Sequence, residues 1–415
     1  MPPSIEGNKR MSDNQAHSRI LRTLVTTIFF ISFPFGLLQF TLPVLGKELG
    51  ASALAIAGLY SAFSLTTVLL RPVVGWALDR YGRRPFLVGG LAGYLVANLG
   101  FLAAQSIGML YLARVAQSIG SGLTWLAAYA IIADVALPER RGRSFGRVDQ
   151  AHAQAMLAGM FVFFTVYGFM TEGEMAGGVQ PAWKATFGLF AIFGAYAVWR
   201  AWRLPETGRP QATTAFWPSL RSNWQRISRV LLTLMGIVFL TSAAQTAVSP
   251  LIIIFLQDRF QASLVSIGWA FLPMALIWSF LPSRMGAIGD RVGRKLPMAA
   301  GLAVSGTVTL FIPRVPSLLL LAALWAVEAL AFSASVPAEE ALVADLSGSG
   351  RRGESFGLYT FAAGLGAVVG PLVGGWLYDN LGHAAPFYAT AAAVFLGAAL
   401  ILILVKEPPR VSPGG

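Results

Sequence analysis

The chain has 415 residues and no cysteine, and 55% of its side chains are hydrophobic while only 12% are charged. Soluble proteins carry about twice that share of charge, so with a mean hydropathy of +0.64 the composition excludes disordered, collagen-like and coiled-coil chains and predicts an integral membrane protein. The absence of cysteine excludes a disulfide framework, a thiolate metal site and a cysteine nucleophile, and we attribute the net charge of +12 to cytoplasmic loops rather than to nucleic-acid binding.

The first half of the chain contains six apolar runs long enough to cross a bilayer. A spanning helix needs about 20 mostly apolar residues, and these runs are too long for the strands of a membrane β-barrel. After an N-terminal tail at 1–19, the predicted spans are 20–45, 53–78, 85–104, 108–133, 144–170 and 184–202. We expect them to form one bundle, 20–202, and the first run to be retained because no small-residue cleavage site follows it.

The second half repeats this organisation after an Arg-rich linker at 203–228, where Trp217 and Trp224 favour a short interfacial helix. The six further predicted spans are 229–256, 262–288, 296–312, 316–345, 355–378 and 383–405. We expect a second bundle over 229–405 and a tail at 406–415. The predicted fold is therefore an all-α membrane protein with twelve transmembrane helices in two six-helix bundles.

The basic residues predict the orientation. With both termini in the cytoplasm, 26 of the 31 Lys and Arg residues lie on the cytoplasmic side, and Arg114 lies within a span. Because Lys and Arg gather in cytoplasmic loops, this bias predicts a multi-pass protein of the plasma membrane, the inner membrane in bacteria, with both termini cytoplasmic.

An internal repeat relates the two halves at a fixed offset of 211 residues. Residues 75–84 (Gly-Trp-Ala-Leu-Asp-Arg-Tyr-Gly-Arg-Arg) match residues 286–295 (Gly-Ala-Ile-Gly-Asp-Arg-Val-Gly-Arg-Lys) at five of ten positions. The same offset places Ala133-Asp134 on Ala344-Asp345, and Ser144-Phe145-Gly146 on Ser355-Phe356-Gly357. Since each half has six spans in the same orientation, the repeats are parallel and related by an axis along the membrane normal.

These motifs resemble those of the major facilitator superfamily. The loop pattern Gly-x-x-x-Asp-Arg-x-Gly-Arg-Arg is typical of that family, and residues 114–122 resemble the span-four motif of its proton-linked drug exporters, with Ser118 where glycine is usual. The Gly/Pro-rich stretch that such exporters carry in span five stands here in span eleven, at 366–375. The resemblance implies a secondary transporter, not an enzyme, that rocks two bundles about a central site, nearest the twelve-span drug:proton antiporters.

The resemblance also implies a gating clasp on the cytoplasmic side. Asp79 is expected near the N-terminus of span eleven and Arg83 is expected to reach Asp134, with the second copy mirroring these contacts. Ordinary positive-inside topology with incidental ion pairs is the alternative. The predicted clasp residues are Gly75, Asp79, Arg80, Gly82, Arg83, Asp134, Gly286, Asp290, Arg291, Gly293, Arg294 and Asp345.

Ionisable residues inside spans are the candidates for proton coupling, because they are costly there unless they serve a function. Glu328 lies twelve residues into span ten, near mid-bilayer, and is the repeat equivalent of Gln117; Glu339 follows it by eleven residues on the same face. An apolar cavity lets a glutamate carry a proton at neutral pH, so Glu328 is the first candidate. Its alternative role is a buried hydrogen bond to a neighbouring hydroxyl or backbone group.

Three further residues complete the candidate set. Arg114 could hold a nearby carboxylate ionised, or it could snorkel outward. Asp149 and His152 share a face of span five and could serve as a proton relay, a substrate contact or, as a weaker reading, a divalent-metal pair with Glu328. Sequence alone does not choose among these roles, and no zinc signature is present.

Aromatic and amide side chains predict the wall of the cavity. Together they indicate a broad aromatic pocket with few polar anchors, which suits amphipathic organic molecules better than sugars. Lipid contact or packing is the alternative for each one. The residues are Phe33, Gln39, Trp125, Gln245, Trp278 and Trp325.

The leading function is therefore a proton-coupled antiporter that exports amphipathic organic compounds by alternating access. A proton-linked importer of a small metabolite or chelated metal, and a lipid or glycolipid flippase, remain alternatives on the same fold. No phosphate-binding loop is present, so ATP does not drive transport. We expect no cofactor, the proton gradient as energy source, a small-molecule substrate, protons and membrane lipids as partners, no nucleic acid, no metal, and a monomer.

Overall fold

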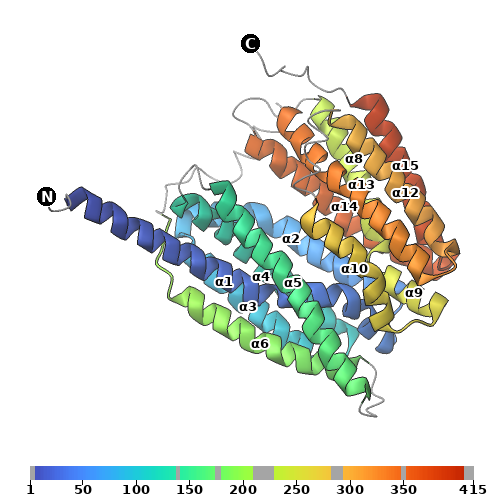
Figure 1. Ribbon diagram of the computed structural model, residues 1–415, viewed down its shortest axis with the longest axis horizontal. Helices are drawn as coiled ribbons and strands as arrows, with labels where there is room; N and C mark the ends of the chain where they lie inside the picture. The colour runs from blue at the N-terminus through green and yellow to red at the C-terminus, as the bar shows by residue number, and fades with distance from the viewer. Residues whose placement is uncertain are drawn as a thin grey trace. The chain divides into compact units, whose positions relative to one another are not determined.

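The computed structural model describes residues 5–136, 141–172, 179–208, 229–281, 293–346 and 352–405, and the regular structure within these ranges is helical (Figure 1). It divides into two compact units. The first comprises Met1–Leu49 and Thr66–Ser219, and the second comprises Gly50–Leu65 and Leu220–Gly415. The second helix of the chain therefore contributes its first residues to one unit and the rest to the other.

In the first unit, α3 packs between α4 and α6, while α1 packs on α5 and α6 (Figure 1). Proline or a serine cap begins three of these helices: Pro85 starts α3, Ser106 accepts the backbone N–H of Met109 at the start of α4, and Pro181 starts α6. The helices are α1 (Ile5–Glu48), α2 (Ala53–Tyr81), α3 (Arg84–Ala103), α4 (Ile107–Val135), α5 (Arg141–Glu172) and α6 (Gln180–Trp202).

The second unit repeats this packing: α12 lies between α13 and α15, and α8 packs on α14 and α15 (Figure 1). Each of these pairs is the counterpart of a pair in the first unit. The predicted repeat is therefore present in three dimensions. The helices are α8 (Arg229–Val248), α9 (Ile252–Phe260), α10 (Leu264–Phe280), α12 (Lys295–Phe311), the short 3-10 helix η2 (Ile312–Arg314), α13 (Leu318–Leu346), α14 (Arg352–Leu381) and α15 (Ala385–Leu404).

Ten of the described helices are long and apolar enough to cross a membrane, with α8 and α9 forming one span, Arg229–Phe260. The all-helical fold with two repeated halves is confirmed, and the fifth span, predicted at 144–170, is found at Ser144–Met170. Two predicted spans are not among the ten. The helix α6 carries Lys184 and Arg200, which lower its hydropathy, and the apolar part of α10 is short, at Leu264–Trp278.

Close backbone contacts at glycines explain the tightest helix pairs, and they follow the repeat. A Cβ on Gly90 would clash with Thr124, and 211 residues later a Cβ on Gly301 would clash with Ser335. Along α14, three glycines one turn apart abut the backbone of α8, at Phe239, Ala243 and Ala247. These glycines are Gly366, Gly370 and Gly374, from the Gly/Pro-rich stretch of the sequence. The stretch therefore serves as the contact face between α8 and α14.

Candidate transport site and charged loop

A polar cluster joins three helices of the first unit. On α5, the His152 Nδ1 lies 2.8 Å from the Ser32 hydroxyl of α1, and the Tyr129 hydroxyl of α4 donates to an Asp149 carboxylate oxygen at 2.8 Å. The predicted sharing of a helix face by Asp149 and His152 is therefore present, and each has its own partner on another helix. The tautomer of His152 determines whether its Nδ1 donates the hydrogen bond to Ser32 or accepts it.

Aromatic rings frame this cluster. The ring centroids of Trp125 and Phe35 lie 4.9 and 5.4 Å from that of His152, both nearly edge-on, and Phe145 lies 5.5 Å from Tyr129. Tyr129 is 39% exposed, so the cluster is open on the side of its tyrosine. A few polar groups within aromatic walls are the pattern of sites that bind organic molecules.

Arg114 and Gln117 form a buried pair on α4. An Arg114 guanidinium nitrogen donates to the Gln117 side-chain oxygen at 2.7 Å, and the two residues are 6% and 1% exposed. Arg114 therefore points into the unit, and the outward-snorkelling alternative does not describe it. Ser118, which stands where glycine is usual, bonds the Thr67 hydroxyl of α2 at 2.8 Å.

In the second unit, Glu328 occupies the position that Gln117 holds in the first. The Ser305 hydroxyl of α12 donates to a Glu328 carboxylate oxygen on α13 at 2.6 Å. Trp325 lies one turn earlier, with its ring centroid 4.1 Å from that of Phe271 of α10 and the two rings tilted by 33°. Farther along α13, Glu339 is half-buried. The hydroxyl contact expected as the alternative role of Glu328 is present.

The predicted wall residues have different surroundings. Phe33 is buried among Phe30, Phe190 and Phe193, with ring centroids 5.0 to 6.3 Å apart, so it packs within its unit. Trp325 is also buried. Trp278 and Gln39 are exposed and Gln245 is half-buried. Of the predicted set, Trp125 is the member that contacts a predicted ionisable residue, His152.

The charged loop between α2 and α3 centres on Arg83. Its side chain pairs with Asp79 at 3.1 Å and with Asp134 of α4 at 3.2 Å, and it donates to the Leu78 carbonyl at 2.6 Å. The contact expected between Arg83 and Asp134 is therefore present. Asp79 remains half-exposed, and its expected place at span eleven stays a prediction. Arg80 lies with its guanidinium over the Trp76 ring, 5.5 Å from the ring centroid, and Gly75 is half-buried in α2.

Glu206, just after α6, completes this loop and was not among the sequence candidates. Its carboxylate accepts hydrogen bonds from the backbone N–H groups of Arg83 at 2.7 Å and Arg84 at 3.1 Å. A negative charge is favourable there because these groups lie at the N-terminus of α3. Gly82 has a φ of +93°, and a Cβ there would lie 2.6 Å from a Glu206 carboxylate oxygen. The sequence signal was a lone acidic residue at the start of an Arg-rich linker, which we had interpreted as a connection only.

The second copy of the loop is described in part. Gly293 has a φ of +99°, matching Gly82 at the offset of 211, and Arg294 stands at the N-cap of α12. The two glycines therefore share the left-handed backbone conformation at equivalent positions. Outside the described residues lie Gly286, Asp290, Arg291 and the side chain of Asp345.

A second capping carboxylate lies at the other end of α2. The two carboxylate oxygens of Asp379, near the end of α14, accept the backbone N–H groups of Ala53 and Leu54 at 3.1 and 2.9 Å. One turn earlier, Gly375 lets α14 approach Leu54, since a Cβ there would lie 2.6 Å from its Cα. Asp379 directly follows the predicted span 355–378, and nothing in the local sequence indicates a partner more than 300 residues away.

Comparison with known proteins then decides the family. The model of the Major Facilitator Superfamily matches residues 24–284 and 234–415. The chain belongs to the Major Facilitator Superfamily. Its membership agrees with the repeated loop motif, the twofold packing of the helices and the multi-pass character of the chain.

Individual members of the superfamily are similar over almost the whole length. The chain is 27% identical over 375 residues to the class G tetracycline resistance protein of Vibrio anguillarum, covering 86% of this chain and 88% of that protein. It is 22% identical over 389 residues to multidrug resistance protein 1 of Bacillus subtilis, and the match covers 92% of this chain and 95% of that protein. The crystal structure of the nucleoside transporter NupG (D323A mutant) is similar in fold, with a TM-score of 0.72 and 14% identity. That match covers 93% of this chain and 100% of the NupG chain.

Proposed function

We propose that this superfamily transporter is a proton-coupled antiporter that exports amphipathic organic compounds. The observation that carries the proposal is the setting of Glu328, whose carboxylate accepts a hydrogen bond from the neutral hydroxyl of Ser305. Among the described residues no Lys or Arg forms an ion pair with it. A carboxyl group that lies within a span and is not paired with a cationic side chain can gain and lose a proton during a transport cycle.

The two repeats differ in the charged residues that they carry at equivalent positions. At the offset of 211, Arg114 corresponds to Trp325 and Gln117 to Glu328. This helical segment therefore carries a positive charge in the first unit and, one turn along, a carboxyl group in the second. Arg114 is bound to neutral Gln117, and its charge does not change with pH. We assign the changing charge to Glu328 and the fixed charge to Arg114.

We assign cargo recognition to the cluster of Ser32, Tyr129, Asp149 and His152. Its rings offer apolar surface and cation–π faces, while Asp149 offers a negative charge. The similar proteins from Vibrio anguillarum and Bacillus subtilis are named for tetracycline and multidrug resistance, which supports amphipathic drugs as the cargo class.

Proteoliposomes containing the full chain test the proposal. A pH gradient that is acidic on the side to which cargo is exported should drive tetracycline or tetraphenylphosphonium transport toward that side. Addition of the cargo should in turn dissipate the pH gradient. Glu328→Gln should lose gradient-driven transport at least tenfold while cargo exchange without a gradient continues. The matched control is Glu340→Gln, an exposed carboxylate on the same helix, which should behave as the unmodified protein does.

Two outcomes contradict the proposal. Gradient-driven transport of equal rate in Glu328→Gln would remove Glu328 from coupling. Cargo movement in the same direction as protons in sided vesicles would establish the importer instead.

A further inference from the structure

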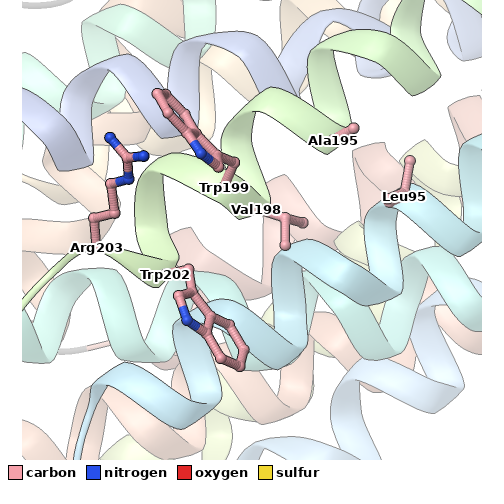
Figure 2. A pocket seen from close by; sticks show the side chains of 6 residues that line it. All are labelled: Leu95, Ala195, Val198, Trp199, Trp202 and Arg203. Carbon is pink, nitrogen blue, oxygen red and sulfur yellow. The ribbon is translucent and has the colours of Figure 1, made fainter.

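Two adjoining hollows lie at the C-terminal end of α6, and both include Arg203. The first is an apolar groove of about 550 Å³ between α6 and α3. Figure 2 shows Trp202 on the side of α6 toward α3, while Trp199 and Arg203 project from the other side. The residues that line it are Leu95, Ala195, Val198, Trp199, Trp202 and Arg203.

The second hollow, of about 350 Å³, is basic and lies between the C-terminal end of α6 and the segment of α1 at residues 19–23. Three arginines line it, Arg19, Arg200 and Arg203, and none of the described residues that line it is acidic. The Nε of Arg200 is buried and has no hydrogen-bond partner among the described residues, and a terminal nitrogen of its guanidinium makes a long bond of 3.4 Å to the Thr23 hydroxyl. A buried guanidinium N–H without a partner is costly, so the geometry favours an acceptor that binds here.

We propose that the two hollows together bind one anionic phospholipid of the surrounding bilayer, such as a phosphatidylglycerol. Its phosphate would lie against Arg19, Arg200 and Arg203, because guanidinium groups pair with phosphate through two parallel hydrogen bonds. Its acyl chain would follow the groove past Val198, Ala195 and toward Leu95.

The aromatic residues support a lipid rather than a soluble anion. Tryptophans gather at the membrane–water interface, and Trp199 and Trp202 are 48% and 64% exposed at this helix end. The Arg203 guanidinium lies 3.9 Å from the centroid of the Trp199 ring, and that of Arg84 lies 5.7 Å from the centroid of Trp202. Positive charge and apolar surface therefore adjoin each other, which matches the headgroup and acyl chain of a phospholipid. A soluble phosphate would leave the apolar groove uncovered.

The test uses the purified full chain in neutral detergent, with binding measured by native mass spectrometry and by thermal unfolding. The probes are palmitoyl-oleoyl phosphatidylglycerol, phosphatidylcholine with the same chains, and sn-glycerol 3-phosphate. We expect phosphatidylglycerol to bind at least tenfold more tightly than phosphatidylcholine, and glycerol phosphate not to raise the unfolding midpoint.

Variants locate the site. Arg200→Gln with Arg203→Gln should weaken phosphatidylglycerol binding at least tenfold, and Ala195→Trp, which fills the groove, should weaken it several-fold with both arginines in place. Arg22→Gln is the matched control, since Arg22 is exposed on α1 one turn from Arg19 and lines neither hollow. It should leave binding unchanged.

Several results would overturn the proposal. These are equal affinity for phosphatidylglycerol and phosphatidylcholine, equal weakening by Arg22→Gln, and stabilisation by glycerol phosphate as large as that by the lipid. If the double arginine variant does not fold, unchanged phosphatidylglycerol binding in Ala195→Trp also overturns it.

Discussion

At the scale of single residues, the hydrogen bond from Tyr129 to Asp149 is the contact whose loss most directly tests the cargo site. Tyr129→Phe keeps the ring and removes the donor, which leaves the Asp149 carboxylate without the 2.8 Å bond. Hydrogen bonds to charged groups contribute about 1.5–3 kcal/mol, so we expect cargo affinity to change about tenfold or more. Quenching of tryptophan fluorescence measures it, since Trp125 adjoins the cluster.

The control for this prediction is Tyr196→Phe, a tyrosine of α6 that is also 39% exposed and lies outside the cluster. It should leave affinity unchanged. Equal affinity in Tyr129→Phe and the unmodified protein would place cargo recognition elsewhere.

Gly82 gives a second test at this scale, because its backbone is in the left-handed region and faces Glu206. Gly82→Ala should strain the turn by about 1–2 kcal/mol and also displace the carboxylate that caps α3. Gly50→Ala is the matched control, because Gly50 also has a positive φ, of +75°, but a Cβ added there would meet no atom within 4 Å. The unfolding midpoint of Gly82→Ala should therefore fall below that of Gly50→Ala, and equal midpoints would show that the Glu206 contact is unimportant.

At the scale of helices, the contact of α14 with α8 depends on glycine at each turn. A Cβ on Gly370 would overlap the Ala243 carbonyl and the Thr246 hydroxyl, so Gly370→Ala must push the helices apart. Overpacking costs about 1–3 kcal/mol, and we expect a lower midpoint in thermal unfolding. On α8, Gly236→Ala meets nothing within 4 Å and should be neutral or slightly stabilising, since alanine favours helix. A drop in Gly236→Ala as large as in Gly370→Ala would contradict the close-contact account.

Helices and their repeat could be predicted from the sequence because apolar runs and the offset of 211 are local or periodic patterns. The contact between Arg83 and Asp134 was implied by the resemblance of the loop motif to a known family. The capping roles of Glu206 and Asp379 could not be predicted, because their partners are backbone N–H groups more than 100 residues away. Backbone groups leave no signature in the sequence. Phe33 was assigned to a cavity wall because hydrophobicity does not indicate which face of an almost uniformly apolar helix is buried.

At the scale of the whole molecule, the two repeats share their helix packing while differing in charge. Arg114 with Gln117 in the first corresponds to Trp325 with Glu328 in the second. Symmetric packing suits two bundles that move against each other, and asymmetric charge allows one repeat to respond to protons. We therefore propose that proton exchange occurs in the second unit and cargo recognition at the aromatic cluster of the first.

Proton release on cargo binding tests this central claim most directly. In weakly buffered detergent solution near neutral pH, saturating tetracycline or tetraphenylphosphonium should displace protons from the full chain, recorded with a pH-sensitive dye. The account predicts release that disappears in Glu328→Gln, while cargo still binds and Glu340→Gln releases as the unmodified protein does. Equal proton release from Glu328→Gln and the unmodified protein would contradict it.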